Sequence, residues 1–139
     1  MIYIFIFISM FFFHVLDDYV LQGCLANLKQ KEWWKKNAPN ELYKFDYIMA
    51  LVCHSISWAF MITLLLVIAT ISLNIYQGIN FQDNLWILLL TYPINVTIHA
   101  IVDDLKANKH AINLIQDQII HFGQILVTFG LFMLVQLLH

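Results

Sequence analysis

The sequence has few charged residues and no arginine at all. Asp, Glu, Lys and Arg make up 12% of its 139 residues, and 61% are hydrophobic. A soluble domain usually has about a quarter charged residues and about half apolar ones. This scarcity of charge argues against an ordinary soluble domain and favours an integral membrane protein. The only two cysteines, Cys24 and Cys53, are too few for a disulfide framework or a cysteine-based metal site.

Basic residues are also scarce outside two short groups. The seven are all lysines; Lys29, Lys31, Lys35, Lys36 and Lys44 form one group, and Lys106 and Lys109 form the other. A nucleic-acid-binding domain needs a basic face, and nothing beyond these two groups offers one. The sequence therefore predicts a protein that does not bind nucleic acid.

Four stretches are long and apolar enough to span a bilayer, which takes about 20 mainly apolar residues. They cover about residues 1–22, 43–73, 84–105 and 111–138. The second exceeds one span, so its first turns are expected in the membrane interface. No low-complexity linker divides the stretches. We therefore expect an all-α fold, a four-helix transmembrane bundle, forming a single integral membrane domain over residues 1–139.

The connection between the first two helices, CLANLKQKEWWKKNAPNE, predicts an interfacial segment. Trp33 and Trp34 lie between lysines, and such a pattern places aromatic rings at headgroup depth and ammonium groups in water. Pro39 and Asn40 then mark a break before the second helix. The alternative is a plain solvated loop.

The distribution of lysines predicts the orientation of the chain. Both groups fall in the odd-numbered connections, and the middle connection, at residues 74–84, has none. Short loops rich in lysine stay on the cytoplasmic side. We therefore expect both lysine-bearing connections inside and both termini outside, in a bacterial inner membrane.

The apolar stretches carry a repeated pairing of histidine with aspartate. The first and third have the pattern HxxxD, the fourth has the reverse, and the second has a lone histidine. The seven residues are His14, Asp18, His54, His99, Asp103, Asp117 and His121. Residues four apart share one face of a helix. At about 1.5 Å per residue, the four histidines and Asp117 lie roughly 9–15 Å in from the lysine-marked side, so we expect the set in one layer.

A layer of buried ionisable groups needs an explanation, because a carboxylate at a span centre costs about 2.5–3.5 kcal/mol on insertion scales. One explanation is a polar network that holds the helices together. A divalent metal, zinc or manganese first, explains the set better. Histidine nitrogen and aspartate oxygen are ordinary ligands for such ions, and the cation neutralises the carboxylates. The seven residues are thus predicted metal ligands, for one ion or two.

Neighbouring residues receive catalytic roles in this interpretation. Asp17 is three residues from His14, so it remains open which aspartate is the ligand and which the base; Asp17 and Asp117 are the candidates for the base. Lys106 follows Asp103 by three and is a candidate for holding an anion, with a membrane-flanking lysine as the alternative. Asp104 points partly away from the face of His99.

The motifs together resemble a known family. They are HxxxDYxxQ, a second-span histidine, HxxxDxxK and DQxxH, made by His14, Asp18, Tyr19, Gln22, His54, His99, Asp103, Lys106, Asp117, Gln118 and His121. In order and spacing they resemble an uncharacterised family of small four-span membrane proteins of phages and bacteria, which is similar to the membrane-bound metal-dependent hydrolases. The resemblance implies a four-span fold and a metal site.

The functional hypothesis is a membrane-embedded metal-dependent hydrolase with its site in the cytoplasmic half of the bilayer. The depth of the layer suggests a lipid or another phosphoester as substrate. The alternatives are a metal-ion or proton transporter and a non-enzymatic phage membrane effector. Transport needs polar residues that continue to the far side, and the far halves of the helices have few. The bilayer is the expected partner, and an oligomer is left open.

Overall fold

Four long helices make up most of the computed structural model, which describes residues 1–77 and 81–138. They are α1 (Ile2–Leu16), α4 (Asp46–Gln77), α5 (Phe81–Ala107) and α6 (Leu114–Leu138). No strand occurs among the described residues. The prediction of an all-α four-helix bundle is confirmed.

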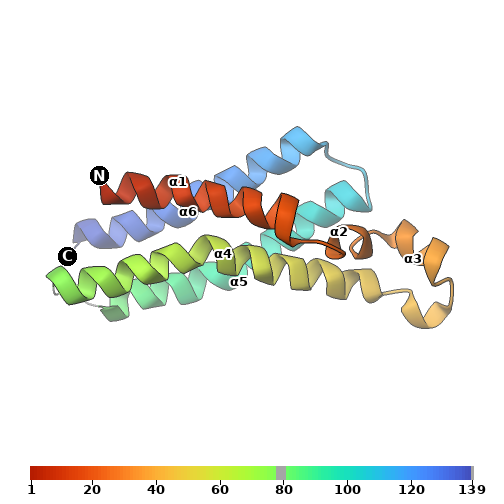
Figure 1. Cartoon of the computed structure of the whole chain (residues 1–139), viewed down its shortest axis with the longest axis horizontal. Helices are drawn as coiled ribbons and strands as arrows, with labels where there is room; N and C mark the ends of the chain where they lie inside the picture. Colours follow the sequence, from red (N-terminus) through yellow and green to blue (C-terminus); the bar gives the residue numbers. More distant parts are fainter. Residues whose placement is uncertain (78–80, 139) are drawn as a thin grey trace.

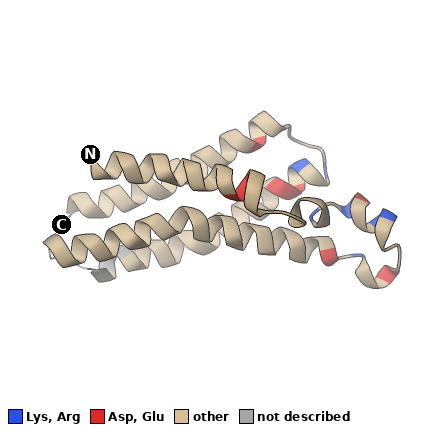
Figure 2. Cartoon of the chain, in the orientation of Figure 1, with Lys and Arg blue, Asp and Glu red and all other residues tan. Residues whose placement is uncertain are grey.

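The helices run up and down, so that the two termini lie at the same end (Figure 1). Helix α4 packs against α1 and α5, and α6 closes the bundle by contacting α5 and α1. Figure 2 shows the lysines at the opposite end, in the segment that joins α1 to α4 and around the end of α5. Residues 78–80 of the predicted lysine-free connection lie outside the described part of the chain.

Each long helix is long and apolar enough to cross a membrane. The qualifying stretches are Ile2–Leu21, Glu41–Tyr76, Leu85–Ala107 and Leu114–Leu138. Large apolar side chains cover the outside of the bundle, among them Phe5, Met49, Leu90 and Leu126. A helix that is apolar on its outward face as well as inside suits lipid and not water.

The half of the bundle nearest the termini has an apolar core. Ile6, Met10, Ile62, Leu66 and Phe132 are buried in one cluster. In lipid such a cluster holds helices together mainly by van der Waals packing, because the tails outside are equally apolar. This core fixes the spacing of the helices on the side of the His/Asp residues that faces the termini.

The first span departs from a regular helix near the lysine-marked end. Helix α1 ends at Leu16 and continues as a π turn, η1 (Asp17–Leu21), in which the Gln22 amide donates to the Asp17 carbonyl at 3.0 Å. Such turns insert one extra residue and are frequent at functional sites. The expected first span, over about residues 1–22, therefore consists of an α-helix followed by a π turn.

The connection from α1 to α4 is helical and is not a plain loop. It contains α2 (Leu25–Leu28), α3 (Lys31–Asn37) and the 3₁₀ turn η2 (Glu41–Tyr43), and both α2 and α3 contact α4. The Asn108 side chain joins this connection to the end of α5: it donates to the Lys29 carbonyl at 3.0 Å and accepts from the Lys31 amide at 2.7 Å. Its place at the membrane interface stays a prediction.

Candidate metal centre

The four helices bring every predicted His and Asp into one buried group. This His/Asp layer consists of His14, Asp17, Asp18, His54, His99, Asp103, Asp117 and His121, each no more than 7% exposed. Helices α1 and α5 run toward the lysine-marked end, so the aspartate of each HxxxD pair lies one turn nearer that end. Helix α6 runs the other way, which explains why its pair is reversed in the sequence.

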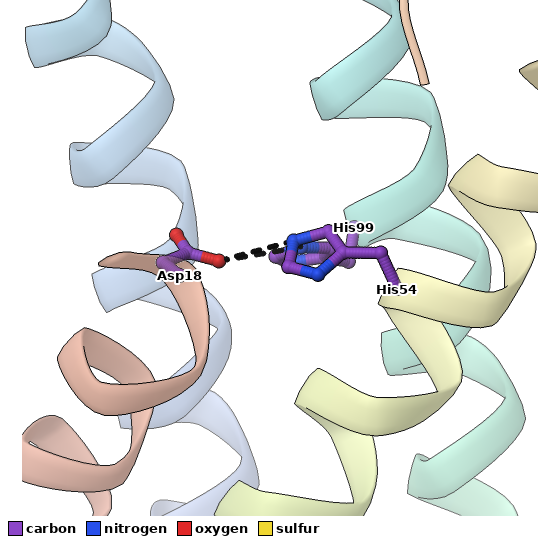
Figure 3. Close-up of side chains that lie close together, drawn as sticks. All are labelled: Asp18, His54 and His99. Carbon is purple, nitrogen blue, oxygen red and sulfur yellow. Dashed lines mark hydrogen bonds and ion pairs between the residues drawn. The ribbon is translucent and has the colours of Figure 1, made fainter. Parts of the chain in front are cut away.

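Three side chains from three helices converge at the centre of the layer (Figure 3). His54 Nε2 lies 3.2 Å from His99 Nε2, and Asp18 Oδ1 lies 3.2 Å from the first nitrogen and 3.8 Å from the second. A point equidistant from atoms so spaced is about 2.0 Å from each, within the range of zinc–nitrogen and zinc–oxygen bonds. Asp103 Oδ2 lies 3.5 Å and 3.9 Å from the same nitrogens and can complete four donors.

The hydrogen bonding of these donors fits a cation. Asp18 Oδ1 is buried and has no hydrogen-bond partner among the described residues. Two ring nitrogens that face each other can share only one hydrogen atom, which leaves the carboxylate oxygen beside them unsatisfied. Burying an unsatisfied charged oxygen is costly. A cation at the centre would satisfy His54, His99 and Asp18 at once.

A second group shares His99 and extends to α6. His99, Asp103 and His121 offer donor atoms close enough to hold an ion, with the rings of His99 and His121 stacked at 4.1 Å between centroids. His121 Nδ1 lies 3.0 Å from Gln124 Oε1, which can only accept, so Nδ1 carries the hydrogen. The other ring nitrogen, Nε2, lies 3.7 Å from Asp103 Oδ1 and 3.4 Å from Asp117 Oδ1.

His14 lies beside these donors and its ring is held by other partners. Trp58 Nε1 donates to its Nδ1 at 2.7 Å, and its Nε2 lies 2.9 Å from Gln118 Oε1. Both ring nitrogens are therefore occupied, and His14 belongs to neither group of converging donors. Its predicted role as a ligand stays a prediction, and the observed contacts suit a residue that positions the bundle around the donors.

Asp17 lies behind His54, on the side away from Asp18. Its Oδ1 accepts from Ser57 Oγ at 2.6 Å, and its Oδ2 is 3.6 Å from His54 Nδ1. Metal-bound histidines commonly present their other nitrogen to a carboxylate, which fixes the ring orientation. This placement suits an orienting role for Asp17 better than the predicted role of proton acceptor.

Two lysines bind aspartates of the layer. Lys106 Nζ donates to Asp117 Oδ2 at 2.5 Å, and its side chain is 31% exposed, at the edge of the site. Lys29 Nζ donates to Asp103 Oδ2 at 2.6 Å and is buried. Sequence reasoning grouped Lys29 with the membrane-flanking lysines, because no spacing in the sequence distinguishes it from them. Only the packing of the α2 segment and its anchor at Asn108 bring it to the site.

A polar chain leads from His121 toward the far side of the bundle. Gln124 Nε2 donates to the Asn95 carbonyl at 3.2 Å, and Asn95 Nδ2 donates to Thr128 Oγ1 at 2.8 Å. All three side chains are buried. The half of the bundle nearest the termini therefore contains more buried polar side chains next to His121 than we expected from the sequence.

If the histidines are neutral, the carboxylates of the layer outnumber its cations. Four buried carboxylates (Asp17, Asp18, Asp103 and Asp117) face two ammonium groups, those of Lys29 and Lys106. With neutral histidines the group carries two excess negative charges. Buried charges are normally paired or bound to metal. One divalent cation would neutralise the excess.

Comparisons with protein families, with curated proteins and with solved structures gave no match. The arrangement of the donors therefore carries the functional argument. Fold and site define a class: an all-α protein with four helices of membrane-spanning length and buried His/Asp groups that could hold a metal ion.

Proposed function

We propose that this chain is an integral membrane protein that holds a divalent metal ion in its His/Asp layer and hydrolyses an ester or phosphoester bond there. The observation that carries the proposal is the convergence of His54 Nε2, His99 Nε2 and Asp18 Oδ1 at 3.2–3.8 Å from one another. Two nitrogen donors and short separations favour zinc first and manganese second.

Each part of the chemistry falls to a named group. A bound divalent cation supplies Lewis-acid polarisation of the scissile ester or phosphoryl group. His54, His99 and Asp18 hold it, Asp103 is available as the fourth donor, and Asp17 orients the His54 ring.

The proton acceptor and the anion holder lie on the α6 side. Asp117 Oδ1 is buried, has no hydrogen-bond partner among the described residues and suits a general base. Water adds to the substrate, its proton passes to Asp117, and the same proton goes to the departing alkoxide. Lys106, at the partly exposed edge, holds the anionic oxygen of the substrate.

A lipid phosphoester is the proposed substrate class. The histidines of the layer and Asp117 lie roughly 9–15 Å inside the lysine-marked end, in the half of the bilayer nearer the headgroups at that end, and we propose that this end faces the cytoplasm, in a bacterial inner membrane. The resemblance of the sequence motifs to the family of small phage and bacterial membrane proteins is one of the arguments for this proposal. It supports the metal site more strongly than the reaction.

The test combines metal analysis, thermal melts and turnover on the detergent-purified chain. Zinc or manganese should raise the melting temperature over that in chelator, since a ligand at a thousandfold excess over its Kd stabilises by about 4 kcal/mol. Hydrolysis of a lipid phosphoester panel should require the same metal. A melt indifferent to metal and chelator would remove the metal site. A metal-dependent melt without turnover would remove the hydrolase.

A transporter of protons or metal ions is the second candidate, because the polar chain through Gln124, Asn95 and Thr128 extends the site toward the far side. Relays of polar side chains mark ion pathways in membranes. Flux into vesicles containing the protein, lost in Gln124→Leu with metal binding retained, would favour transport. Turnover without flux would favour hydrolysis.

A further inference from the structure

A cavity of about 330 Å³ lies at the lysine-rich end of the molecule, in the segment that joins α1 to α4. It is formed where α3, the turn η2 and the first turn of α4 fold against one another. None of its lining residues belongs to the His/Asp layer. The residues that matter for its chemistry are Lys31, Trp34, Lys35, Tyr43, Lys44 and Tyr47.

The cavity lining is cationic. Three lysines and a single acidic residue, Glu41, line it. Lys44 lies 3.2 Å from Glu41, and Lys35 lies 2.6 Å from Glu32. Both pairs are exposed, and such pairs contribute little to stability. They can therefore open to bind another anion.

Lys31 has an aromatic neighbour in place of an acidic one. Its Nζ lies 4.7 Å from the centroid of the Tyr47 ring, and no carboxylate lies within ion-pair distance of it among the described residues. The contact with Tyr47 raises the pKa of Lys31 above its ordinary value, so it remains a cation. An ammonium group is thus held at the cavity without a counter-ion.

Aromatic rings beside the cavity indicate at which level of the bilayer it lies. Trp34 and Tyr43 stack with centroids 6.2 Å apart, and the Trp34 indole donates to the Leu28 carbonyl at 2.7 Å. The candidate membrane span that contains η2 and α4 starts at Glu41, beside these rings. Tryptophan and tyrosine gather at the headgroup level of a bilayer. Phe45 lines the cavity and is exposed, as is Leu42 beside Tyr43 in the sequence.

We propose that this cavity binds the phosphate headgroup of an anionic membrane phospholipid in the leaflet at the lysine-rich end. Lysines near an anionic leaflet are attracted to it, and here three of them line one cavity together with aromatic rings. The acyl chains extend along the apolar outer face of α4. The proposal does not depend on the metal site.

The anchor at Asn108 gives this binding a structural consequence. The Asn108 side chain holds both the Lys29 carbonyl and the Lys31 amide. Lys31 faces the cavity, whereas Lys29 reaches Asp103. A bound headgroup therefore steadies the same short segment that brings an ammonium group into the His/Asp layer.

The test compares lipid binding by two double variants with the same change of charge. The delipidated full chain is titrated in detergent with dioleoyl-phosphatidylglycerol or dioleoyl-phosphatidylcholine, and bound lipid is counted by native mass spectrometry. We expect at least tenfold preference for phosphatidylglycerol. Lys31→Gln with Lys44→Gln should abolish the preference. The control, Lys36→Gln with Lys109→Gln, alters lysines outside the cavity and should retain it.

Three results would overturn the proposal. Equal binding of the two lipids by the unaltered chain would exclude a headgroup site, and equal losses in the two double variants would show a general charge effect. Full displacement of the lipid by millimolar glycerol phosphate would indicate a site for a free phosphate compound. A thermal melt checks that each variant is folded; if the cavity variant is not, Lys31→Gln is compared with Lys36→Gln.

Discussion

Asp17 Oδ2 lies 3.6 Å from Nδ1 of His54, while Asp18 Oδ1 lies 3.2 Å from Nε2 of the same ring. Two adjacent carboxylates thus reach opposite edges of one imidazole. Both aspartates lie in the π turn that begins at Asp17. In the proposed metal site this arrangement would give different tasks to two neighbouring residues that the sequence could not separate: Asp18 would be the donor toward the metal, and Asp17 would face the other ring nitrogen of His54.

Asp17→Asn should weaken zinc binding without abolishing it. Loss of a partner that orients a histidine ligand typically costs 10–100-fold in metal affinity. Competition with a chromophoric chelator measures the affinity, and Asp104→Asn is the matched control. Complete loss of binding in Asp17→Asn would make Asp17 a ligand itself.

Asp18→Ala should abolish zinc binding, and Asp104→Ala should retain it. Asp18 offers the oxygen at the centre of the site, whereas Asp104 is engaged by Lys109 at 3.1 Å and by Asn108 at 2.9 Å. Metal content of the two purified variants decides the matter. Equal losses would show that the face assigned to the metal is wrong.

Lys29→Met should destabilise the protein most when metal is absent. Removing one partner of a buried ion pair costs about 3–5 kcal/mol, because the other charge is left uncompensated. Zinc beside Asp103 should restore part of this loss. Unfolding in denaturant, with zinc and with chelator, measures both values, and Lys36→Met is the exposed control. The same loss with and without zinc would place the metal away from Asp103.

The orientation can be tested by labelling single cysteines. Cys24 and Cys53 are both exposed and are first replaced by serine. A membrane-impermeant thiol reagent should label Tyr76→Cys in intact cells and Lys36→Cys only after the membrane is opened. Labelling of position 36 in intact cells would contradict the predicted orientation.

The layer could be predicted from the sequence because its members repeat at four-residue spacing on helices of known rise. His99 and Asp103 show this directly: spacing places them on one face, and distance from Lys106 places them one turn apart in the half of the helix nearer the lysines. Lys29 could not be predicted, because its position depends on how a short segment folds back. The ring partners of His14 also depend on packing between helices, since Trp58 lies in another span.

The reciprocal contacts across the layer have a consequence for how the protein enters its membrane. Asp18 on the first span faces histidines on the second and third, and Asp117 on the fourth meets Lys106 of the third. Each span therefore enters the bilayer with a polar group whose partner belongs to another span, at a cost of about 2.5–3.5 kcal/mol per lone charge. The polar groups of the first span find their partners only after the later spans have been synthesised, so the four spans are expected to settle into lipid as a unit once the fourth has been made.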